Sequence, residues 1–172
     1  MRIKRGKKYH KYVNFFRVVY KFHPPFKVLL DGNFFHHTVK ESMDIKLQLH
    51  RILQDQPFIF LTKCVMRELE NAGDAILGPK TLAAARKTVK LPCSHSGGIV
   101  PPDECILDYI GKRNESKVFV GTNDEELRNR LRNNGTCPLF FFKNNILIMD
   151  APSDVSDQKF KLKEQLKMEP TK

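Results

Sequence analysis

The sequence lacks tryptophan, has four cysteines and contains no long apolar run. Its longest apolar stretches, PLFFF and NILIM, are far shorter than the ~20 residues that cross a membrane as a helix. The charged start is not followed by an apolar segment, so we expect no secretory signal. We therefore expect an intracellular protein whose cysteines stay reduced or bind metal instead of forming disulfides.

Acidic residues are missing from the first part of the chain, where Asp31 is the first one. The stretch before it, MRIKRGKKYHKYVNFFRVVYKFHPPFKVLL, is basic, aromatic or apolar, and a second basic stretch, KFKLKEQLKMEPTK, closes the chain. Over the whole sequence, 30 Lys and Arg against 19 Asp and Glu give a formal net charge of +11. Basic extensions of this kind favour a polyanionic partner, most commonly nucleic acid. The alternative is a solvated tail that only aids solubility.

Between the basic ends, short apolar runs alternate with helical patterns, which predict strands and amphipathic helices respectively. The expected strands are 26–31, 58–62, 117–122, 139–142 and 145–149, and the expected helices are 44–55, 63–72, 78–89, 103–111 and 124–134. This order predicts a three-layer α/β domain with a central, mainly parallel sheet. The domain would cover residues 23–150, between a basic N-terminal extension, 1–22, and a basic C-terminal tail, 151–172. The extension would be partly helical and dock on the core through residues at helical spacing: Phe15, Val18, Val19 and Phe22.

Four acidic residues are predicted to lie at one edge of this sheet, because sites in α/β sheets form beyond the carboxyl ends of the strands. Asp31 ends the first strand and Asp124 follows the third, while Glu68 and Glu104 lie in the first turns of two helices. Clustered carboxylates repel one another unless they bind a cation, and a bound divalent metal can activate water. The alternative is that these are ordinary helix caps and strand-end acids, which explains Asp31 least well.

A loop between two expected helices carries the sequence LPCSHSGGIVPPDEC. Cys93, His95 and Cys105 supply three metal ligands from this stretch, and Cys64 can supply a fourth from an earlier helix. Three thiolates and one imidazole suit a closed, structural zinc site, and zinc would hold a loop that buries little surface. The alternative is that Cys64 and Cys105 are small buried apolar residues. The remaining cysteine, Cys137, is expected in the core.

Several ordered motifs together resemble one protein family. FKVLLDG after a basic start, TKCVMRELE, LPCSHSGG…DECI, VGTNDEELRNRLR and CPLFFF resemble the PIN-like ribosome-biogenesis factors of the Fcf-one/Utp-twenty-three family, over residues 1–150. The N-terminal stretch is more similar to the Utp-twenty-three branch. The resemblance implies a PIN-domain fold with a CCHC zinc site at Cys64, Cys93, His95 and Cys105. It also implies a nucleolar protein of the small-subunit processome that is needed for early pre-rRNA cleavages and is associated with an H/ACA snoRNA.

The same resemblance implies a carboxylate set at Asp31, Glu68, Glu104 and Asp124, with Thr122 as the accompanying hydroxyl. The Fcf-one branch has a second Asp where this chain has Glu104, and the extra methylene moves the carboxylate, although Asp103 could substitute. The Utp-twenty-three branch is regarded as having a degraded site, so we expect an RNA-binding assembly factor and lean against an enzyme. The alternative is a metal-dependent endoribonuclease that holds Mg²⁺ or Mn²⁺ at the acidic edge. A third hypothesis is a scaffold that binds only proteins.

RNA contacts are expected at the basic N-terminus, because cations there can neutralise phosphates with little sequence preference. Tyr9, Tyr12 and Phe15 would stack on unpaired bases or, alternatively, pack on the core. The first candidates for phosphate contacts are Arg2, Lys4, Arg5, Lys7, Lys8 and Lys11.

Overall fold

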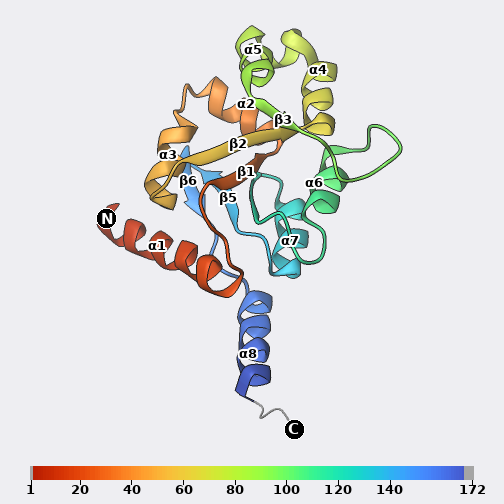
Figure 1. Cartoon of the computed structure of the whole chain (residues 1–172). Coiled ribbons are helices and arrows are strands. Elements are labelled where there is room, and N and C mark those ends of the chain that lie inside the picture. The colour runs from red at the N-terminus through yellow and green to blue at the C-terminus, as the bar shows by residue number, and fades with distance from the viewer. Residues whose placement is uncertain (1, 169–172) are drawn as a thin grey trace.

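The computed structural model describes residues 2–168, apart from the side chains of residues 2–4, 159 and 163. Within this range, a six-stranded sheet lies at the centre of the molecule (Figure 1). In sheet order its strands are β3 (Val89–Leu91), β2 (Pro57–Thr62), β1 (Phe26–Leu30), β4 (Val118–Gly121), β5 (Leu139–Lys143) and β6 (Ile146–Met149). Neighbouring strands run parallel except β5 and β6, which are antiparallel. The predicted mainly parallel sheet is therefore confirmed.

Helices cover both sides of the sheet, and Figure 1 shows α2, α4 and α5 on one side and α1 and α7 on the other. The helices are α1 (Arg2–Val19), α2 (Gly32–Lys40), α3 (Ile45–Leu53), α4 (Lys63–Leu77), α5 (Pro79–Lys87), α6 (Pro102–Ile110), α7 (Glu125–Asn134) and α8 (Asp154–Met168). Because both faces are covered, the central strands β1 and β4 are buried almost throughout. This is why they are mostly apolar, with Lys27 as the exception, and do not alternate with polar residues.

The first segment docks on the core through most of the predicted residues, since Phe22 is buried and Phe15 and Val19 pack against the core, but not through Val18. Tyr9, Val13, Phe16 and Tyr20 are buried and recur at helical spacing, whereas Val18 is 56% exposed. The expected docking through Val18 was therefore wrong, because this longer stripe of large side chains is the one that faces the sheet. Tyr9 belongs to the core and is not available for base stacking, while Tyr12 and Phe15 are half-buried against the core.

Two elements of the sheet domain were absent from the expected order. The sequence of α2, GNFFHHTVK, is short of strong helix formers, and the helix is stabilised by tertiary contacts. Phe34 is fully buried and stacks on Phe142, with 4.6 Å between ring centroids. The strand β3 is a three-residue edge strand with little burial, so it carries no apolar run that would predict it. Because β3 begins at Val89, the helix expected at 78–89 is shorter than predicted and ends at Lys87.

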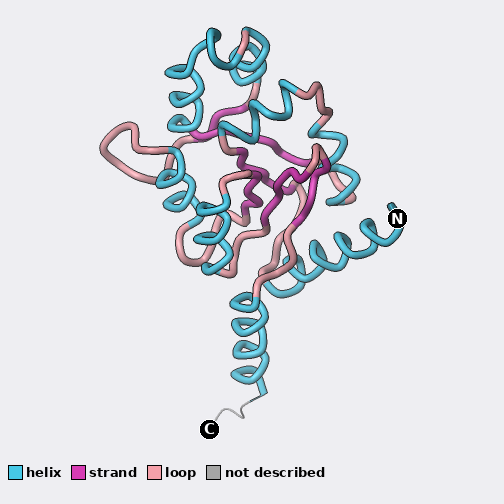
Figure 2. The backbone as a smooth tube through the Cα atoms, turned by 180° about the vertical axis from the view of Figure 1, so that it is seen from behind, coloured by secondary structure: helices cyan, strands magenta, loops and turns pink. Residues whose placement is uncertain are grey.

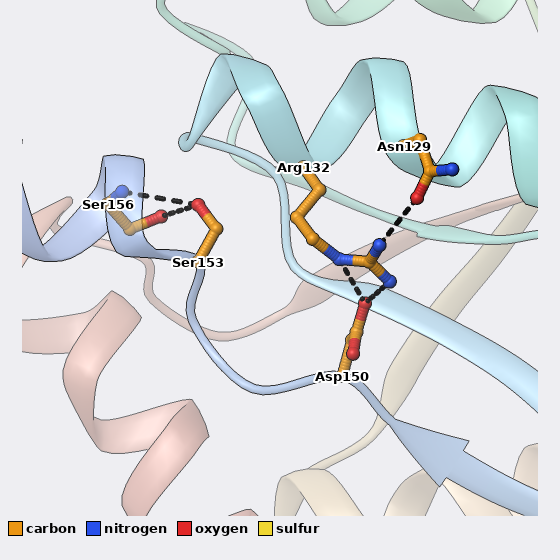
Figure 3. A network of polar contacts seen from close by, with 5 residues as sticks. All are labelled: Asn129, Arg132, Asp150, Ser153 and Ser156. Carbon is orange, nitrogen blue, oxygen red and sulfur yellow. Dashed lines mark hydrogen bonds and ion pairs between the residues drawn. The ribbon is translucent and has the colours of Figure 1, made fainter.

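The C-terminal segment forms α8, which projects from the body near the end of α1, as Figures 1 and 2 both show. Its start is tied to α7 and to the end of β6 (Figure 3). Arg132 donates hydrogen bonds to Asp150 through Nε and Nη2 and to Asn129 through Nη1, and the backbone N–H of Ser156 donates to Ser153 Oγ. Among the described residues, no helix has the length and apolar character needed to cross a membrane.

Candidate acidic site and cysteine–histidine centre

Asp31 lies where the chain leaves β1, beside the end of β4. From β1 the chain proceeds to β2 on one side, and it later returns to β4 on the other side. Such a reversal of strand order is the place where α/β sheets form their sites. The Asp31 backbone N–H donates to the Gly121 carbonyl (2.9 Å), so Asp31 is held by the β4 end as well as by its own strand.

The Asp31 carboxylate is almost fully buried and accepts two hydrogen bonds. Oδ1 accepts from the Gly32 backbone N–H (2.8 Å), and Oδ2 accepts from the Thr122 hydroxyl (3.0 Å). Thr122 Oγ1 in turn accepts from the Asp124 backbone N–H (3.1 Å). Thr122 therefore links the acid at the end of β1 to the acid after β4, which gives the hydroxyl a positioning role.

Asp124 and Glu68 lie next to this pair. Asp124 Oδ1 accepts from the Leu127 backbone N–H (3.2 Å) and caps α7. Asp124 is therefore a helix cap, as the alternative interpretation expected, and it also lies in the site. A β-carbon added to Gly32 would lie 2.8 Å from Glu68 Oε2. The Glu68 carboxylate therefore rests against the first turn of α2, in space that only a glycine leaves open.

The carboxylates of this group raise one another's pKa values. Burial raises the pKa of Asp31, its hydrogen bonds from Thr122 and Gly32 lower it, and the charges of Asp124 and Asp103 raise it again, leaving the pKa above its usual value. Burial also raises the pKa of Glu68, and the charges of Asp31 and Asp103 raise it further. A divalent cation with oxygen ligands would remove this repulsion. We call Asp31, Glu68, Asp103 and Asp124 the acid cluster.

Glu104 is placed differently from the other predicted acids. Its Oε1 accepts a hydrogen bond from Arg130 Nη1 (3.0 Å), and the side chain is about half exposed. The carboxylate whose charge reaches Asp31 and Glu68 is that of Asp103, the preceding residue. The pairing of Glu104 with Arg130 and the effect of the Asp103 charge on Asp31 and Glu68 together favour Asp103 as the acid that α6 contributes. No sequence pattern predicts the role of Arg130, which joins α7 to α6 at this edge.

The predicted cysteine–histidine centre is also brought together. The ligand atoms of Cys64, Cys93, His95 and Cys105 all lie within 4.8 Å of one another. The Cys93–Cys64 and Cys105–Cys93 sulfur distances are 3.8 and 3.6 Å, and Cys64 Sγ lies 3.3 Å from His95 Nε2. Sulfur ligands of a tetrahedral Zn²⁺ with bonds of about 2.3 Å lie about 3.8 Å apart. These four residues could therefore hold one metal ion without a change of backbone.

The thiols of this centre differ in acidity. Burial would raise the pKa of Cys93, but hydrogen bonds from the Cys64 backbone and from the neighbouring thiols lower it below its usual value. Burial raises the pKa of Cys105 to about 12. Cys137 lies apart from the centre in the hydrophobic core, as expected. Cys64 precedes Glu68 by one turn on α4, and Cys105 is two residues after Asp103 on α6, so a metal ion bound by the centre would link the two helices that contribute to the acid cluster.

The predicted RNA-contacting residues lie on α1. Arg5, Lys7, Lys8 and Lys11 are all exposed, and Lys8 Nζ lies 5.9 Å from the centroid of the Tyr12 ring. The side chains of the two other candidates, Arg2 and Lys4, are outside the described part of the structure. The exposed cations are carried by a helix whose opposite face is buried, so they are presented on a fixed surface.

The comparison with known proteins identifies the family. A model of the Fcf1 family matches residues 51–151. The chain belongs to the Fcf1 family. This Fcf1-family protein is 30% identical to the rRNA-processing protein utp23 of Schizosaccharomyces pombe over 155 residues, which cover 89% of this chain and 59% of that relative. It is 28% identical to the rRNA-processing protein FCF1 of Saccharomyces cerevisiae, covering 82% of this chain and 72% of the relative.

The fold comparison agrees. The Fcf1-family chain superposes on the PIN domain endonuclease Utp24 with a TM-score of 0.66 and 28% identity, covering 77% of this chain and 97% of that one. The resemblance to the family and the expected PIN-like fold are therefore confirmed. The chain spans 59% of the length of the fission-yeast relative.

Proposed function

We propose that this Fcf1-family chain is an RNA-binding ribosome-biogenesis factor of the small-subunit processome. It would act in the early pre-rRNA cleavages of small-subunit rRNA maturation, in the nucleolus, in association with an H/ACA snoRNA. The observation that carries the proposal is the likeness, over 89% of the chain, to a relative named an rRNA-processing protein. Pre-rRNA, the snoRNA and processome proteins are accordingly its proposed partners.

The physical support is the surface of α1. The helix has no acidic residue, and its described cations point to solvent while its aromatic face is buried. Such a surface binds phosphates with a strong dependence on salt and little dependence on base sequence.

RNA binding by α1 is tested by the anisotropy of a labelled single-stranded RNA of about 20 nucleotides at several salt concentrations. The triple variant Lys7→Gln, Lys8→Gln, Lys11→Gln should reduce the slope of log K against log salt by about 2 units, at about 0.7 per phosphate contact. The matched control removes three exposed cations from α5: Lys80→Gln, Arg86→Gln and Lys87→Gln. Equal slopes in the two variants would refute the assignment to α1.

The cysteine–histidine centre is proposed to hold a structural zinc ion. The support is the donor set of three thiols and one imidazole at tetrahedral spacing, because soft thiolate ligands favour zinc over magnesium or calcium. All four coordination positions would be filled by the protein, which is typical of structural sites. The zinc would hold the exposed loop at 94–99 against α4 and α6.

The alternative function is a metal-dependent endoribonuclease, and the acid cluster is the observation that favours it. A bound Mg²⁺ or Mn²⁺ would supply an activated water and offset the charge that develops on the phosphate. In this chain Asp31, Glu68, Asp103 and Asp124 would hold the ion, and Thr122 would hold the Asp31 carboxylate in place. Cleavage of single-stranded RNA with Mn²⁺ by the wild type but not by Asp31→Asn would support the alternative. Identical background cleavage by both proteins would exclude it.

A further inference from the structure

A second cationic surface lies at the amino edge of the sheet, away from the acid cluster. A groove of about 570 Å³ is lined by four basic side chains, Lys21, Lys112, Arg113 and Lys117, with Glu115 as the single acid. Lys21 comes from the segment before β1, and the other three come from the loop before β4. Because β1 and β4 are parallel, both segments lie at the edge opposite to Asp31. We call this the cationic groove.

The backbone that carries these cations is fixed. Asn114 is 1% exposed, and its side chain donates to the carbonyls of Val118 and Thr136 (2.9 Å each) and accepts from the Val118 backbone N–H (3.1 Å). Lys117 has a φ of 55°, and its Nζ lies 5.9 Å from the centroid of the Phe22 ring. Because the backbone is already ordered, only the side chains lose freedom on binding a ligand.

Among the described residues, the four cations of the groove are not neutralised by ion pairs, although Lys117 lies over the Phe22 ring. The groove volume falls within the ~300–1,000 Å³ of common ligand sites. Val19, Tyr20 and Thr136 complete the lining, so charged residues make up most of it, whereas the core of a protein interface is depleted of charged residues.

We propose that the cationic groove binds the phosphate backbone of single-stranded RNA, as a second contact surface in addition to α1. The inference rests on the proposed RNA-binding function. The groove begins where α1 ends, since Lys21 is two residues beyond Val19. One strand could therefore contact α1 and continue into the groove without approaching the acid cluster.

The test compares the full chain with the variant Lys112→Gln, Arg113→Gln and with the matched control Lys80→Gln, Arg86→Gln on α5. All these side chains are exposed, so thermal melting should be the same for the three proteins. Anisotropy with an RNA of about 20 nucleotides should show a salt slope lower by about 1.4 units for the groove variant, and about tenfold weaker binding at 0.1 M salt. The control should stay near the wild type.

The outcomes distinguish a failure of the groove inference from a failure of the proposed RNA-binding function. If the groove variant equals the control while the α1 variant loses affinity, the groove inference is wrong and RNA binding stands. If the wild type does not bind RNA, both fail. Polyglutamate serves as a second polyanion. If the groove variant loses affinity for polyglutamate but not for RNA, the surface binds an acidic protein and the inference is overturned.

Discussion

Asp31 combines a buried charge with a place at the centre of the site. Its side chain is 7% exposed, and it is held by hydrogen bonds from Gly32 and Thr122. Capping of α2 accounts for the bond from Gly32 but not for the bond from Thr122, which follows β4 and is distant in sequence. A carboxylate kept at this position against its own desolvation is typical of functional sites, although structural networks also shift pKa values.

The first prediction concerns the stability of Asp31→Asn. The folded-state pKa of Asp31 is raised above its ordinary value of 3.8, chiefly by burial. The folded state therefore binds this proton more tightly than the unfolded state, and stability falls as the pH rises through the folded pKa. Without added divalent cations, Asp31→Asn should melt at a higher temperature than the wild type at pH 7, and the difference should vanish below pH 3.8.

Each kcal/mol of that difference corresponds to about 2–4 °C in Tm for a chain of this size. The exposed Asp74→Asn on α4 is the control, because it removes one carboxylate outside the acid cluster. With Mn²⁺ present the order should reverse if the acid cluster binds the ion, because only the wild type keeps the full ligand set. A less stable Asp31→Asn at pH 7 without metal would contradict the electrostatic account.

The second prediction concerns the proposed zinc ion and compares two buried cysteines. Cys64→Ala removes one of the four clustered ligands, whereas Cys137→Ala removes a core thiol outside the cluster. Both substitutions lose packing, but only Cys64→Ala should abolish zinc as measured by elemental analysis of chelator-free protein. Cys137→Ala should retain one zinc per chain. Equal zinc in both variants, or a wild type without zinc, would refute the assignment.

At the scale of elements, two arginines join α7 to its neighbours, one at the acidic edge of the sheet and one just before α8. Arg130 pairs with Glu104 on α6, and both side chains are about half exposed. Arg132 pairs with Asp150 at the end of β6 and is less exposed, as is its partner. In Figure 3 the Arg132 guanidinium lies between Asp150 and Asn129, so most of its donors are satisfied.

The third prediction follows from this difference in burial. Arg132→Ala would leave a largely buried Asp150 carboxylate without its charged partner, and we expect a loss of about 1–3 kcal/mol in unfolding free energy. Arg130→Ala on the same helix breaks an exposed pair, for which the loss should be about 1 kcal/mol or less. Urea unfolding of both variants makes the comparison. Equal losses would show that the network in Figure 3 does not anchor the start of α8.

The elements that the sequence predicted are those whose own residues carry the pattern. The strands β1, β2, β4, β5 and β6 are short apolar runs, and their order predicted the parallel sheet. The helix α2 could not be predicted this way, because its stability comes from contacts such as the stacking of Phe34 on Phe142, which lie more than a hundred residues apart. Likewise, Val18 and Phe16 both fit a helical stripe, and only the position of the sheet decides which one is buried.

The candidate site shows the same limit. Asp31, Glu68 and Asp124 could be predicted because strand ends and first helical turns meet at one edge of the sheet. Asp103 and Glu104 are adjacent on a helix, so their side chains point about 100° apart, and the sequence cannot decide which faces the site. The partner of Glu104, Arg130, depends on the packing of α6 against α7, which no local pattern encodes.

At the scale of the whole molecule, charge is separated between the two edges of the sheet. The acid cluster lies at the carboxyl edge, whereas α1 ends beside the cationic groove at the amino edge. An RNA strand would therefore be attracted to α1 and the groove and repelled by the acid cluster unless a divalent cation were bound there. The proposed RNA binding and the alternative cleavage activity would thus use opposite edges of the sheet.

The last prediction uses the length of the RNA. The 18 residues of α1 span about 27 Å. A trinucleotide is shorter than this helix and can occupy α1 or the groove but not both, whereas an RNA of about 16 nucleotides can reach both and contact more phosphates. The salt slope of binding should be steeper for the longer RNA, and Lys112→Gln, Arg113→Gln should remove most of that difference. Equal slopes for the two lengths in the wild type would mean that the protein offers a single phosphate-binding surface.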